Sequence, residues 1–462
     1  MNIAKAYLWF FLLISGLSLY SGCTTLPNVS TVMNEAPPPR QSRQIVSANG
    51  LLSPQKSKAI MERLRRSVNP TDILERHLAV VESVTESPLT KGNKVSLLID
   101  GLATYAAMFE AIQQARDHIN LETFIIEDDV VGRRFAELLL QKQAQGVQVR
   151  LIYDSIGSLQ TPTDFFHRLR SGGVQVVEFN PINPMKTHGY WLLTNPDHRK
   201  MLIVDGKVAI AGGINISSVY SSSLSGRRKE GSHLPWRDTD VRIEGPAVAE
   251  CQKLFLATWQ KQNGPDASAG NFFPDVQEAG TALVRIVGST PGQDNRITFV
   301  VYVSAFTFAE HSIHLTNAYF IPDDQILNAL IDAAKRGVDV KIILPSATDS
   351  SMALNAARYH YSALLQAGVN IYERRNAILH AKTAVIDGVW STVGSTNLDY
   401  WSLLSDDEVN AVILGREFAR AMEKMFADDL VQSQQIKRDA WEKRPGSQKI
   451  KEAFAHLFAL WM

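Results

Sequence analysis

The sequence contains few cysteines and no excess of charge of either sign. Its 462 residues include only two cysteines, Cys23 and Cys251, which excludes a disulfide framework and a zinc site built on cysteines. Lysine plus arginine and aspartate plus glutamate each number 47, so the formal net charge is zero. Because dedicated nucleic-acid binders usually carry a basic excess, we expect no nucleic-acid partner, although a local basic groove stays open.

The N-terminus has an apolar run that is too short to span a bilayer comfortably. Residues 7–20 are apolar or small, follow the positive charge of Lys5, and lead into Ser21-Gly22-Cys23. Small residues directly before a cysteine resemble a lipobox, although Tyr20 stands where that pattern prefers an aliphatic residue. We therefore interpret residues 1–23 as a signal peptide and Cys23 as a lipidation site. Secretion without a lipid and an uncleaved anchor are the alternatives.

The residue after Cys23 bears on location. It is Thr24 and not Asp, which by resemblance to enterobacterial lipoproteins favours sorting to the outer membrane over retention at the inner membrane. The sequence thus predicts a lipid-anchored protein on the periplasmic side of a bacterial cell envelope.

The rest of the chain has the composition of a folded protein. Hydrophobic residues make up 45% and charged residues 20%, which argues against overall disorder. Residues 24–91 begin with a Ser-, Thr-, Asn- and Pro-rich stretch that predicts a flexible tether, followed by a short helix over about 54–66. The main folded region is expected to start near Gly92, and residues 433–462 are expected to form an amphipathic helical tail.

An internal repeat dominates the sequence between these ends. Each half contains an apolar strand, a helix, a second strand that begins with Gly-Val, a further helix and a Gly-Val strand, in that order. The expected ranges are 119–126, 135–143, 146–152 and 173–177 in the first half, and 313–320, 326–335, 337–344 and 368–372 in the second. This order predicts two tandem α/β domains, 92–275 and 276–432, each with a mixed central sheet flanked by helices. A pseudo-two-fold axis would relate them and place one shared site at their interface.

Each half ends in the same histidine motif, His-x-Lys-(x)4-Asp-Gly. The first copy runs from His198 to Gly206 and the second from His380 to Gly388. Six residues separate each Asp from a matching tail, Gly-Gly-Ile-Asn at 212–215 and Gly-Ser-Thr-Asn at 394–397. One copy alone could arise by chance, but two copies with equal spacing in a duplicated chain indicate a functional site.

The spacing of the motif predicts a β-hairpin. Asp-Gly is typical of a two-residue turn, which would pair Val204 with Lys207 and place His198 opposite Gly213. By the same count His380 lies opposite Ser395. Gly213 and Ser395 would then be the small residues that let a substrate approach.

The remaining motif residues follow from the same hairpin. Lys200 and Lys382 lie two residues from their histidines and share a face with them, as do Asn215 and Asn397 further along. Asp205 and Asp387 stay at the turns, away from the histidines, so we expect both to have a structural role. Each half thus offers an imidazole, an ammonium group and an amide.

This set of groups suits the cleavage of a phosphodiester. Lysine and amide donors can stabilise the negative charge on the equatorial oxygens. One histidine can attack phosphorus while the other protonates the leaving alkoxide, and water or an alcohol then resolves the phosphohistidine. The set requires no metal ion and no other cofactor.

A histidine nucleophile also needs a carboxylate that fixes its tautomer. Asp238, in Trp236-Arg237-Asp238, and Glu408, in Glu408-Val409-Asn410, occupy matching places after the two hairpins. We therefore expect Asp238 and Glu408 to serve the two histidines.

The paired motifs, together with Trp236-Arg237-Asp238, Glu244-Gly245-Pro246 and Asn397-Leu398-Asp399, resemble bacterial cardiolipin synthases of the phospholipase D superfamily. The resemblance covers roughly residues 92–441 and implies that His198 is the nucleophile and His380 the general acid. The near-symmetry of the halves also permits the reverse assignment. The N-terminus departs from that family, since it lacks the usual paired transmembrane helices.

The resemblance implies a phosphatidyltransferase whose partners are phospholipids and a membrane surface. A hydrolytic phospholipase D with water as the acceptor is the main alternative, and a nuclease and a catalytically inactive scaffold are less favoured. A monomer suffices in principle, because both motifs lie in one chain. The tail residues Ile450, Phe454, Leu457 and Trp461 predict either an interfacial helix or a helix packed on its own domain. Residues 227–229, Arg-Arg-Lys, either meet anionic headgroups or are a solvated loop.

Overall fold

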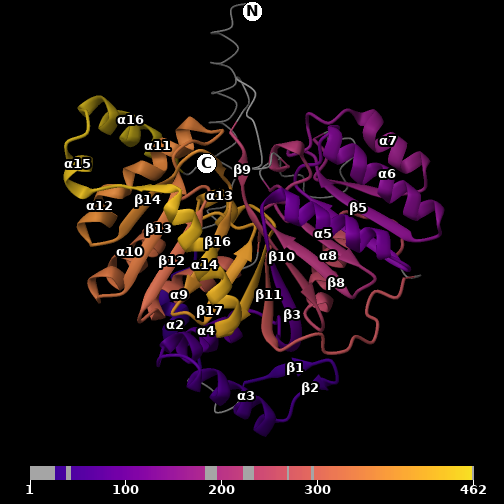
Figure 1. The fold of residues 1–462 in the computed structure, drawn as a ribbon, viewed down its shortest axis with the longest axis horizontal. Helices are drawn as coiled ribbons and strands as arrows, with labels where there is room; N and C mark the ends of the chain where they lie inside the picture. Colours follow the sequence, from indigo (N-terminus) through magenta and orange to yellow (C-terminus); the bar gives the residue numbers. More distant parts are fainter. Residues whose placement is uncertain are drawn as a thin grey trace, which may run out of the picture.

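The computed structural model describes residues 26–37, 43–182, 195–221, 234–267, 270–292 and 296–459. Figure 1 shows two α/β halves side by side, with the segment after the N-terminus packed below them. The predicted signal peptide with Cys23, the basic run 227–229 and Trp461 lie outside the described residues.

The first half is built on a mixed sheet of seven strands. Its first four neighbouring pairs are antiparallel and its last two are parallel. The spatial order is β3 (Leu89–Ile99), β10 (Thr239–Glu244), β8 (Val208–Gly212), β7 (Met201–Val204), β4 (His118–Thr123), β5 (Gln148–Asp154) and β6 (Gln175–Phe179).

The second half repeats this arrangement strand for strand. Again four antiparallel pairs are followed by two parallel ones. The order is β11 (Ala282–Ser289), β18 (Glu408–Leu414), β17 (Trp390–Gly394), β16 (Lys382–Ile386), β12 (Ser312–Asn317), β13 (Asp339–Pro345) and β14 (Asn370–Arg374), with β19 (Ser433–Gln435) added at the edge. The predicted duplication and the mixed α/β architecture are confirmed.

One long strand joins the two sheets. Residues 94–99 of β3 pair with β10 of the first half, whereas residues 90–93 pair with β11 of the second. The apolar core continues across this seam, where Val241 and Ile243 belong to the same buried cluster as Val284, Ile286 and Ile413. The halves are therefore fixed against each other by hydrogen bonds and by a shared core.

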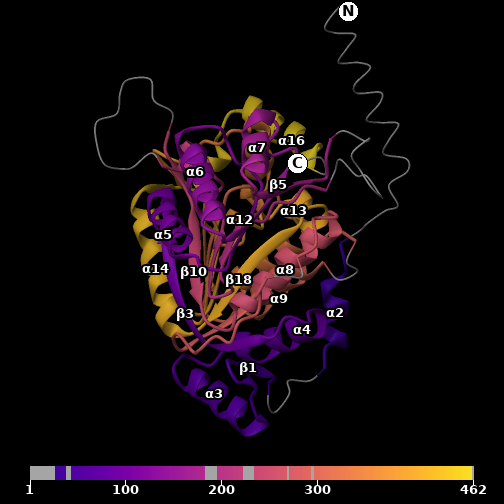
Figure 2. The same cartoon turned by 90° about the vertical axis from the view of Figure 1, so that its right-hand side faces the viewer.

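Helices cover both faces of the joined sheet. Figure 2 shows α5 and α14 on one face and α8 and α9 on the other. Side-chain caps fix several helix starts; Asp129, for example, accepts hydrogen bonds from the N–H groups of Val131 and Gly132 at the start of α6. The helices are α5 (Asp100–Gln114), α6 (Val130–Ala144), α7 (Thr163–Ser171), α8 (Val248–Lys261), α9 (Ile297–Phe308), α10 (Asp324–Lys335), α11 (Ser351–Tyr359), α12 (Tyr361–Gln366), α13 (Tyr400–Leu404), α14 (Arg416–Val431), α15 (Arg438–Glu442) and α16 (Gly446–His456).

The segment before β3 differs from the expected tether. It forms α2 (Val29–Glu35), β1 (Ile45–Ser47), β2 (Gly50–Leu51), α3 (Pro54–Arg66), a 3-10 turn (Asp72–Leu74) and α4 (Arg76–Val84). Val29, Ile45 and Leu78 are buried in the core of the second half. The reason lies in α9, which is apolar on all sides and needs α2 and α4 to cover the face that the sheet leaves open. The prediction of a helix over 54–66 is confirmed.

The two motif hairpins differ from the predicted register by one residue. Val204 pairs with Val208 and Ile386 with Trp390, so three residues, not two, connect the strands. Asp205 has a φ of 52° and is followed by a glycine that also has a positive φ, a conformation that leaves an extra residue before the second strand starts. His198 and His380 therefore do not stand opposite Gly213 and Ser395.

Within the described ranges, we find no helix that combines the length and the apolar character needed to cross a bilayer.

Candidate active site

The histidines of both motifs lie at the same edge of the joined sheet. β7 and β16 begin at or next to the motif lysines, at the edge where the parallel strands β4, β5, β12 and β13 end. The site is shared between the halves, because the charge of Lys382 reaches His198 and that of Lys200 reaches His380. This arrangement is the interface site that the duplicated sequence predicted.

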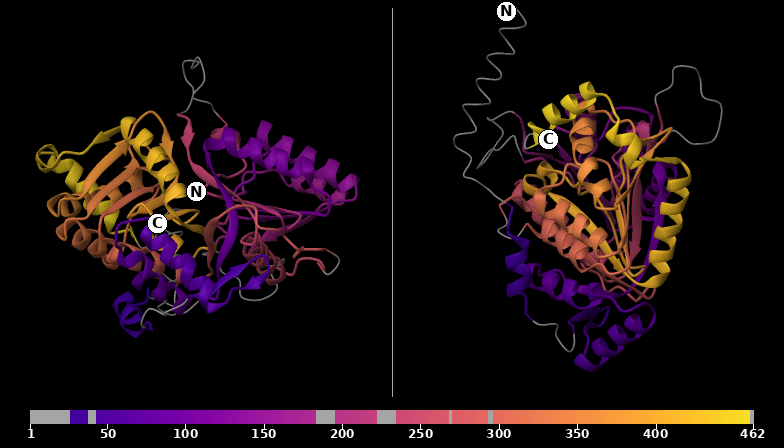
Figure 3. Two further views of the ribbon diagram at one scale, coloured as in Figure 1. Left: turned by 60° about the horizontal axis from the view of Figure 1, so that its bottom comes forward. Right: turned by 90° about the vertical axis from the view of Figure 1, so that its left-hand side faces the viewer.

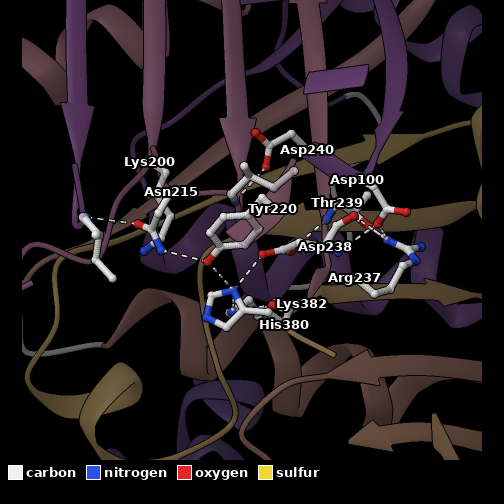
Figure 4. Close-up of polar contacts among 12 residues, drawn as sticks. Asp100, Lys200, Asn215, Tyr220, Arg237, Asp238, Thr239, Asp240, His380 and Lys382 are labelled. Carbon is white, nitrogen blue, oxygen red and sulfur yellow. Dashed lines mark hydrogen bonds and ion pairs between the residues drawn. The ribbon is translucent and has the colours of Figure 1, made fainter. Parts of the chain in front are cut away.

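Each histidine is held by the carboxylate of the opposite half. His198 Nδ1 lies 3.0 Å from Glu408 Oε1, and His380 Nδ1 lies 2.7 Å from Asp238 Oδ2. Both carboxyl groups are completely buried. Because the carboxylate occupies the Nδ1 side, Nε2 of each ring is left for chemistry. Figure 4 shows the contact between Asp238 and His380.

The backbone of each histidine is also bound by the opposite half. The N–H of His198 donates to the carbonyl of Asp407 at 2.9 Å, and the N–H of His380 donates to the carbonyl of Arg237 at 2.8 Å. Asp407 and Arg237 are the residues directly before the two carboxylates. Two short strands, β9 (Trp236–Arg237) and β15 (Ile378–Leu379), pair in parallel beside the second of these hydrogen bonds. Each histidine is thus fixed at its main chain and its ring by the same segment of the opposite half.

The two lysines are buried beside the histidines. Lys200 Nζ donates to the carbonyl of His198 at 2.5 Å, and Lys382 Nζ donates to the carbonyl of His380 and lies 2.9 Å from its Nδ1. Burial lowers the pKa of Lys200 to about 7 and that of Lys382 to about 8. Burial outweighs the opposing effect of nearby carboxylates, including Glu408 and Asp238, so an additional anionic group would stabilise the charged form of both lysines.

Burial also shifts the pKa of the two histidines and that of Glu408, the carboxyl partner of His198. Burial, reinforced by Lys200, lowers the pKa of His198 well below its usual range, and burial reinforced by Lys382 lowers the pKa of His380. Burial raises the pKa of Glu408 to about 7, against the opposing effect of Lys200. A neutral imidazole with a free Nε2 lone pair is the form that can act as a nucleophile.

The two asparagines differ in their partners. Asn215 accepts a hydrogen bond from the N–H of Ile125 at 3.1 Å and donates to the hydroxyl of Tyr220 at 3.1 Å (Figure 4). Asn397 Nδ2 donates to Ser402 at 3.4 Å, while its buried Oδ1 has no hydrogen-bond partner among the described residues. Asn215 thus connects the chain segments of Ile125 and Tyr220 to the first motif, besides any contact with a phosphoryl oxygen.

Gly213 and Ser395 lie against the two carboxylates. A Cβ on Gly213 would stand 2.3 Å from Asp238 Oδ1, so glycine is required for Asp238 to reach His380. The hydroxyl of Ser395 donates to Glu408 Oε2. These two residues therefore have a part in placing the two carboxylates, and their part in admitting the substrate stays a prediction.

The two motif aspartates lie at the hairpin turns, away from the histidines. Asp205 accepts hydrogen bonds from the N–H groups of residues 116–118, and Asp387 from those of residues 310–312. Each carboxylate therefore ties its hairpin to the chain segment that leads into the neighbouring strand, β4 or β12. This geometry fits the structural role expected of them.

Several residues near the histidines were not found from the sequence. Trp236 and Tyr220 pack on His380 with ring centroids at 5.1 and 5.9 Å, and Phe124 packs on His198 at 5.1 Å. Arg199, the middle residue of the first motif, is 2% exposed and makes ion pairs with Asp407 at 3.1 Å and with a second buried carboxylate. In the sequence, the signal that could have identified Arg199 was its difference from Ala381, which holds the same position in the second motif.

One group of ligand atoms has the spacing of a cation site. Atoms of His198, Asp406 and Glu408 all lie within 4.8 Å of one another. Burial raises the pKa of Asp406 and of Glu408, and the positive charge of Lys200 opposes that shift at both carboxyl groups. The ammonium group already supplies a positive charge there and would repel a second cation, so this set fits a metal poorly.

Comparisons with known proteins agree with this geometry. Residues 108–224 and 302–430 match the family described as cardiolipin synthase, PLD-like domain. The chain is 30% identical over 406 residues to a cardiolipin synthase of Geobacillus thermodenitrificans, covering 87% of this chain and 78% of that relative. It is 33% identical over 374 residues to a cardiolipin synthase of Listeria monocytogenes, covering 80% and 76%.

A solved structure shares the fold. The phosphatidylserine synthase of Haemophilus influenzae superposes with a TM-score of 0.59 at 13% identity, covering 84% of this chain and all of that one. The similarity in sequence is low, so this likeness concerns the arrangement of strands and helices alone.

Proposed function

The chain belongs to the cardiolipin synthase, PLD-like family, and from that premise we propose that it transfers a phosphatidyl group to the hydroxyl of an acceptor lipid through a phosphohistidine. The resemblance drawn from the paired motifs is confirmed, and the chain is a phospholipase D superfamily enzyme of the phosphatidyltransferase type. The observation that carries the covalent mechanism is the pair of buried histidines, each held through Nδ1 by a carboxylate of the other half.

The lysines would hold the substrate. A phospholipid phosphodiester carries one negative charge, and Lys200 and Lys382 bring two buried ammonium groups to the same site. The substrate anion would return the pKa of each lysine towards its ordinary value. The same ammonium groups would stabilise the extra charge on the equatorial oxygens when phosphorus becomes five-coordinate.

The chemistry has two balanced steps. In the first, Nε2 of His198 forms a bond to phosphorus, the bond from phosphorus to the headgroup oxygen breaks, and His380 gives that oxygen a proton. In the second, His380 takes the proton from the hydroxyl of the acceptor lipid. The acceptor oxygen then forms a bond to phosphorus and the phosphorus–nitrogen bond breaks, which restores His198.

An asymmetry supports these roles. Burial lowers the pKa of both histidines, but at His380 the carboxylate of Asp238, 2.7 Å from Nδ1, opposes that shift by charge and by a hydrogen bond. His198 is therefore the better candidate for a neutral nucleophile and His380 for the proton donor. The buried ion pairs of Arg199, next to His198 only, are a second difference between the halves.

The location also belongs to the proposal. Lipid attachment at Cys23 on the periplasmic side, with the outer membrane favoured, rests on the sequence pattern of residues 1–24. Metabolic labelling with a radioactive fatty acid, lost in Cys23→Ala, would support it. Labelling that persists in that variant would contradict it.

The experiment that tests the function is a product analysis. We would incubate the protein with vesicles of phosphatidylglycerol and phosphatidylethanolamine and resolve the lipids by mass spectrometry, with His198→Asn as the inactive variant and the exposed His167→Asn as the matched control. Cardiolipin formed by the wild type and by the control, but not by His198→Asn, would establish the transferase. Phosphatidic acid as the only product would show that water is the acceptor.

A second measurement tests the intermediate. With a donor lipid radiolabelled in its phosphatidyl group, His380→Asn should retain acid-labile label on the denatured protein, because a slowed second step leaves the phosphohistidine in place. His198→Asn should retain none. Label in His198→Asn and not in His380→Asn would reverse the two roles.

A further inference from the structure

The exposed apolar side chains of the described residues are strongly segregated. Leu51, in β2, and Phe273, next to the Phe272 that contacts the Gly206 turn, lie at one end of the molecule, and the other large ones lie in or beside elements around the opposite end (Figure 2). Those around that opposite end are Ile99, Leu102, Val130, Ile156, Leu159, Ile182, Val219, Met352, Tyr359, Trp401, Val431, Ile450, Phe454 and Leu457. Single exposed apolar residues are ordinary, but their confinement to one end of a protein marks an interaction surface.

This end is also where the catalytic groups lie. Leu159 follows the end of β5, and Met352 follows the end of β13, at the sheet edge where β7 and β16 begin. We call this edge, with the loops and helices that surround it, the site face. Figure 2 shows α7 and α16 at this end, opposite α3 and β1. The apolar residues thus surround the opening of the active site on both halves.

The helix α16 and its C-cap carry three of the exposed apolar residues of the site face. It packs on α11 through Ala455, and its Glu452 is buried and pairs with Arg444 at 2.7 Å. Its outer surface carries Ile450, Phe454 and Leu457, which are 71%, 58% and 75% exposed. The right-hand view of Figure 3 shows α16 at the outside of the molecule. Of the two sequence-based alternatives for this helix, the structure shows features of both, a packed side and an apolar outer side.

The exposed charges on α16 are of one sign. Lys449 and Lys451 are exposed beside the apolar residues, whereas the only acidic residue of the helix, Glu452, is buried and paired. A helix with an apolar outer surface and only basic exposed charge complements the anionic headgroups of a phospholipid bilayer.

We propose that the site face docks on a phospholipid bilayer with α16 inserted at the headgroup level, so that the active site opens directly onto the lipids. This inference rests on the proposed function, because a diacyl substrate keeps its chains in the bilayer and its phosphodiester at the surface. The apolar residues are spread singly over separate loops of both halves, which fits insertion between lipids better than a continuous contact with one protein partner. A second copy of this chain is the competing occupant.

Insertion can be measured directly at α16. Phe454→Cys in the full chain would carry an environment-sensitive fluorophore, with Leu51→Cys as the matched control and the unaltered chain as the blank for its own cysteines. On adding vesicles of phosphatidylglycerol and phosphatidylethanolamine, the emission at position 454 should shift to the blue and that at position 51 should not. No shift at either position, or equal shifts at both, would overturn the proposal.

Turnover gives the second readout. In a variant with Ile450→Ser, Phe454→Ser and Leu457→Ser, the rate of lipid turnover in vesicles should fall by about tenfold or more. The reason is that affinity for the membrane increases with the apolar area inserted into it. Turnover of a monomeric short-chain phosphatidylglycerol should stay the same. The control variant Leu51→Ser, Phe273→Ser should match the wild type on both substrates.

The outcomes separate this inference from the proposed function. Equal loss of vesicle and monomer turnover in the triple variant would overturn the docking role of α16. Sedimentation gives a further outcome. If the wild type is a dimer, the triple variant is a monomer, and the emission at position 454 does not shift with vesicles, the face binds a second copy of the chain and the proposal is overturned. A clear shift at position 454 in a protein that turns over no lipid would leave the docking face standing and remove the proposed function.

Discussion

At the scale of single residues, the site depends on two small residues that allow the carboxylates to approach the histidines, as well as on the motif residues themselves. Gly213 has no side chain where Asp238 passes, and the hydroxyl of Ser395 takes the matching place beside Glu408. The histidines can therefore be oriented only if both neighbours stay small. A change at either position would act on the histidine of the opposite half.

Gly213→Ala should lower kcat by about a hundredfold with little change in the fold, because a displaced carboxylate of Asp238 would misorient His380. Gly446→Ala is the control, since a Cβ there meets nothing within 4 Å. Steady-state kinetics and melting temperatures of both variants would be compared. If Gly213→Ala kept the wild-type kcat, Asp238 would not be needed in its observed position.

The pH dependence follows from the buried lysines and Glu408. The pKa of Lys200 is lowered to about 7 and that of Lys382 to about 8, so kcat/KM should fall as the pH rises through these values and the ammonium groups are lost. On the acid side it should fall below about 7, where Glu408 takes up a proton. Lys200→Arg, which keeps its charge, should move the start of the alkaline fall from about 7 to about 8, where Lys382 then loses its proton. A rate that stays constant through pH 7 and 8 would show that the lysines retain their protons.

At the scale of secondary-structure elements, the N-terminal segment is part of the catalytic fold. α4 packs on α9, and His77, Leu78 and Val81 of α4 are buried there. Because α9 would otherwise expose apolar residues on its outer side, the second half needs this cover to keep its core dry.

Leu78→Ala should lower the free energy of unfolding by about 2–5 kcal/mol, as expected when a buried leucine is truncated. Ser83→Ala, on the exposed side of the same helix, should change it by less than about 0.5 kcal/mol. Urea unfolding followed by tryptophan fluorescence would measure both. Equal effects of the two changes would mean that α4 is not part of the cooperative core.

The sequence predicted those elements whose signal is local and repeated. The strand and helix order of each half, the helix α3 and the motif residues all follow from periodicity and from the duplication. The hairpin register was missed by one residue, because the extra residue after Asp205-Gly206 depends on backbone dihedrals that the residue types only suggest. The N-terminal cover was missed, because the Ser-, Thr-, Asn- and Pro-rich stretch after Cys23 indicated a tether, and the apolar side of α4 has no partner until α9 is placed beside it.

The partners of the two histidines show the limit of sequence reasoning most clearly. Asp238 and Glu408 were expected to serve them, since both follow a motif hairpin, but nothing local indicates that each serves the other half. The pairs that form are 142 residues apart for His380 and 210 residues apart for His198. The contacts that bring them together are the antiparallel pairing of β3 with β11, the pairing of β9 with β15 and the shared apolar core.

At the scale of the whole molecule, two complete motifs in one chain form one site. A mixture of His198→Asn and His380→Asn proteins should therefore stay inactive, because neither chain contains both histidines and none can borrow one from a neighbour. The measurement is lipid turnover after the two variants have been co-expressed and purified together. Recovery of about a quarter of the wild-type rate, as statistical pairing of subunits predicts, would show that the site forms between chains.

The crossing of the carboxylates has a consequence for the time at which the enzyme becomes active. While the ribosome is still making the second half, the first half can already contain His198 and Lys200, but the carboxylate that orients His198 is 210 residues away and not yet made. Asp238, which is made early, has no histidine to hold until His380 emerges. A nascent chain next to its lipids is thus chemically silent, and phosphodiester cleavage begins only once the two halves have closed on each other.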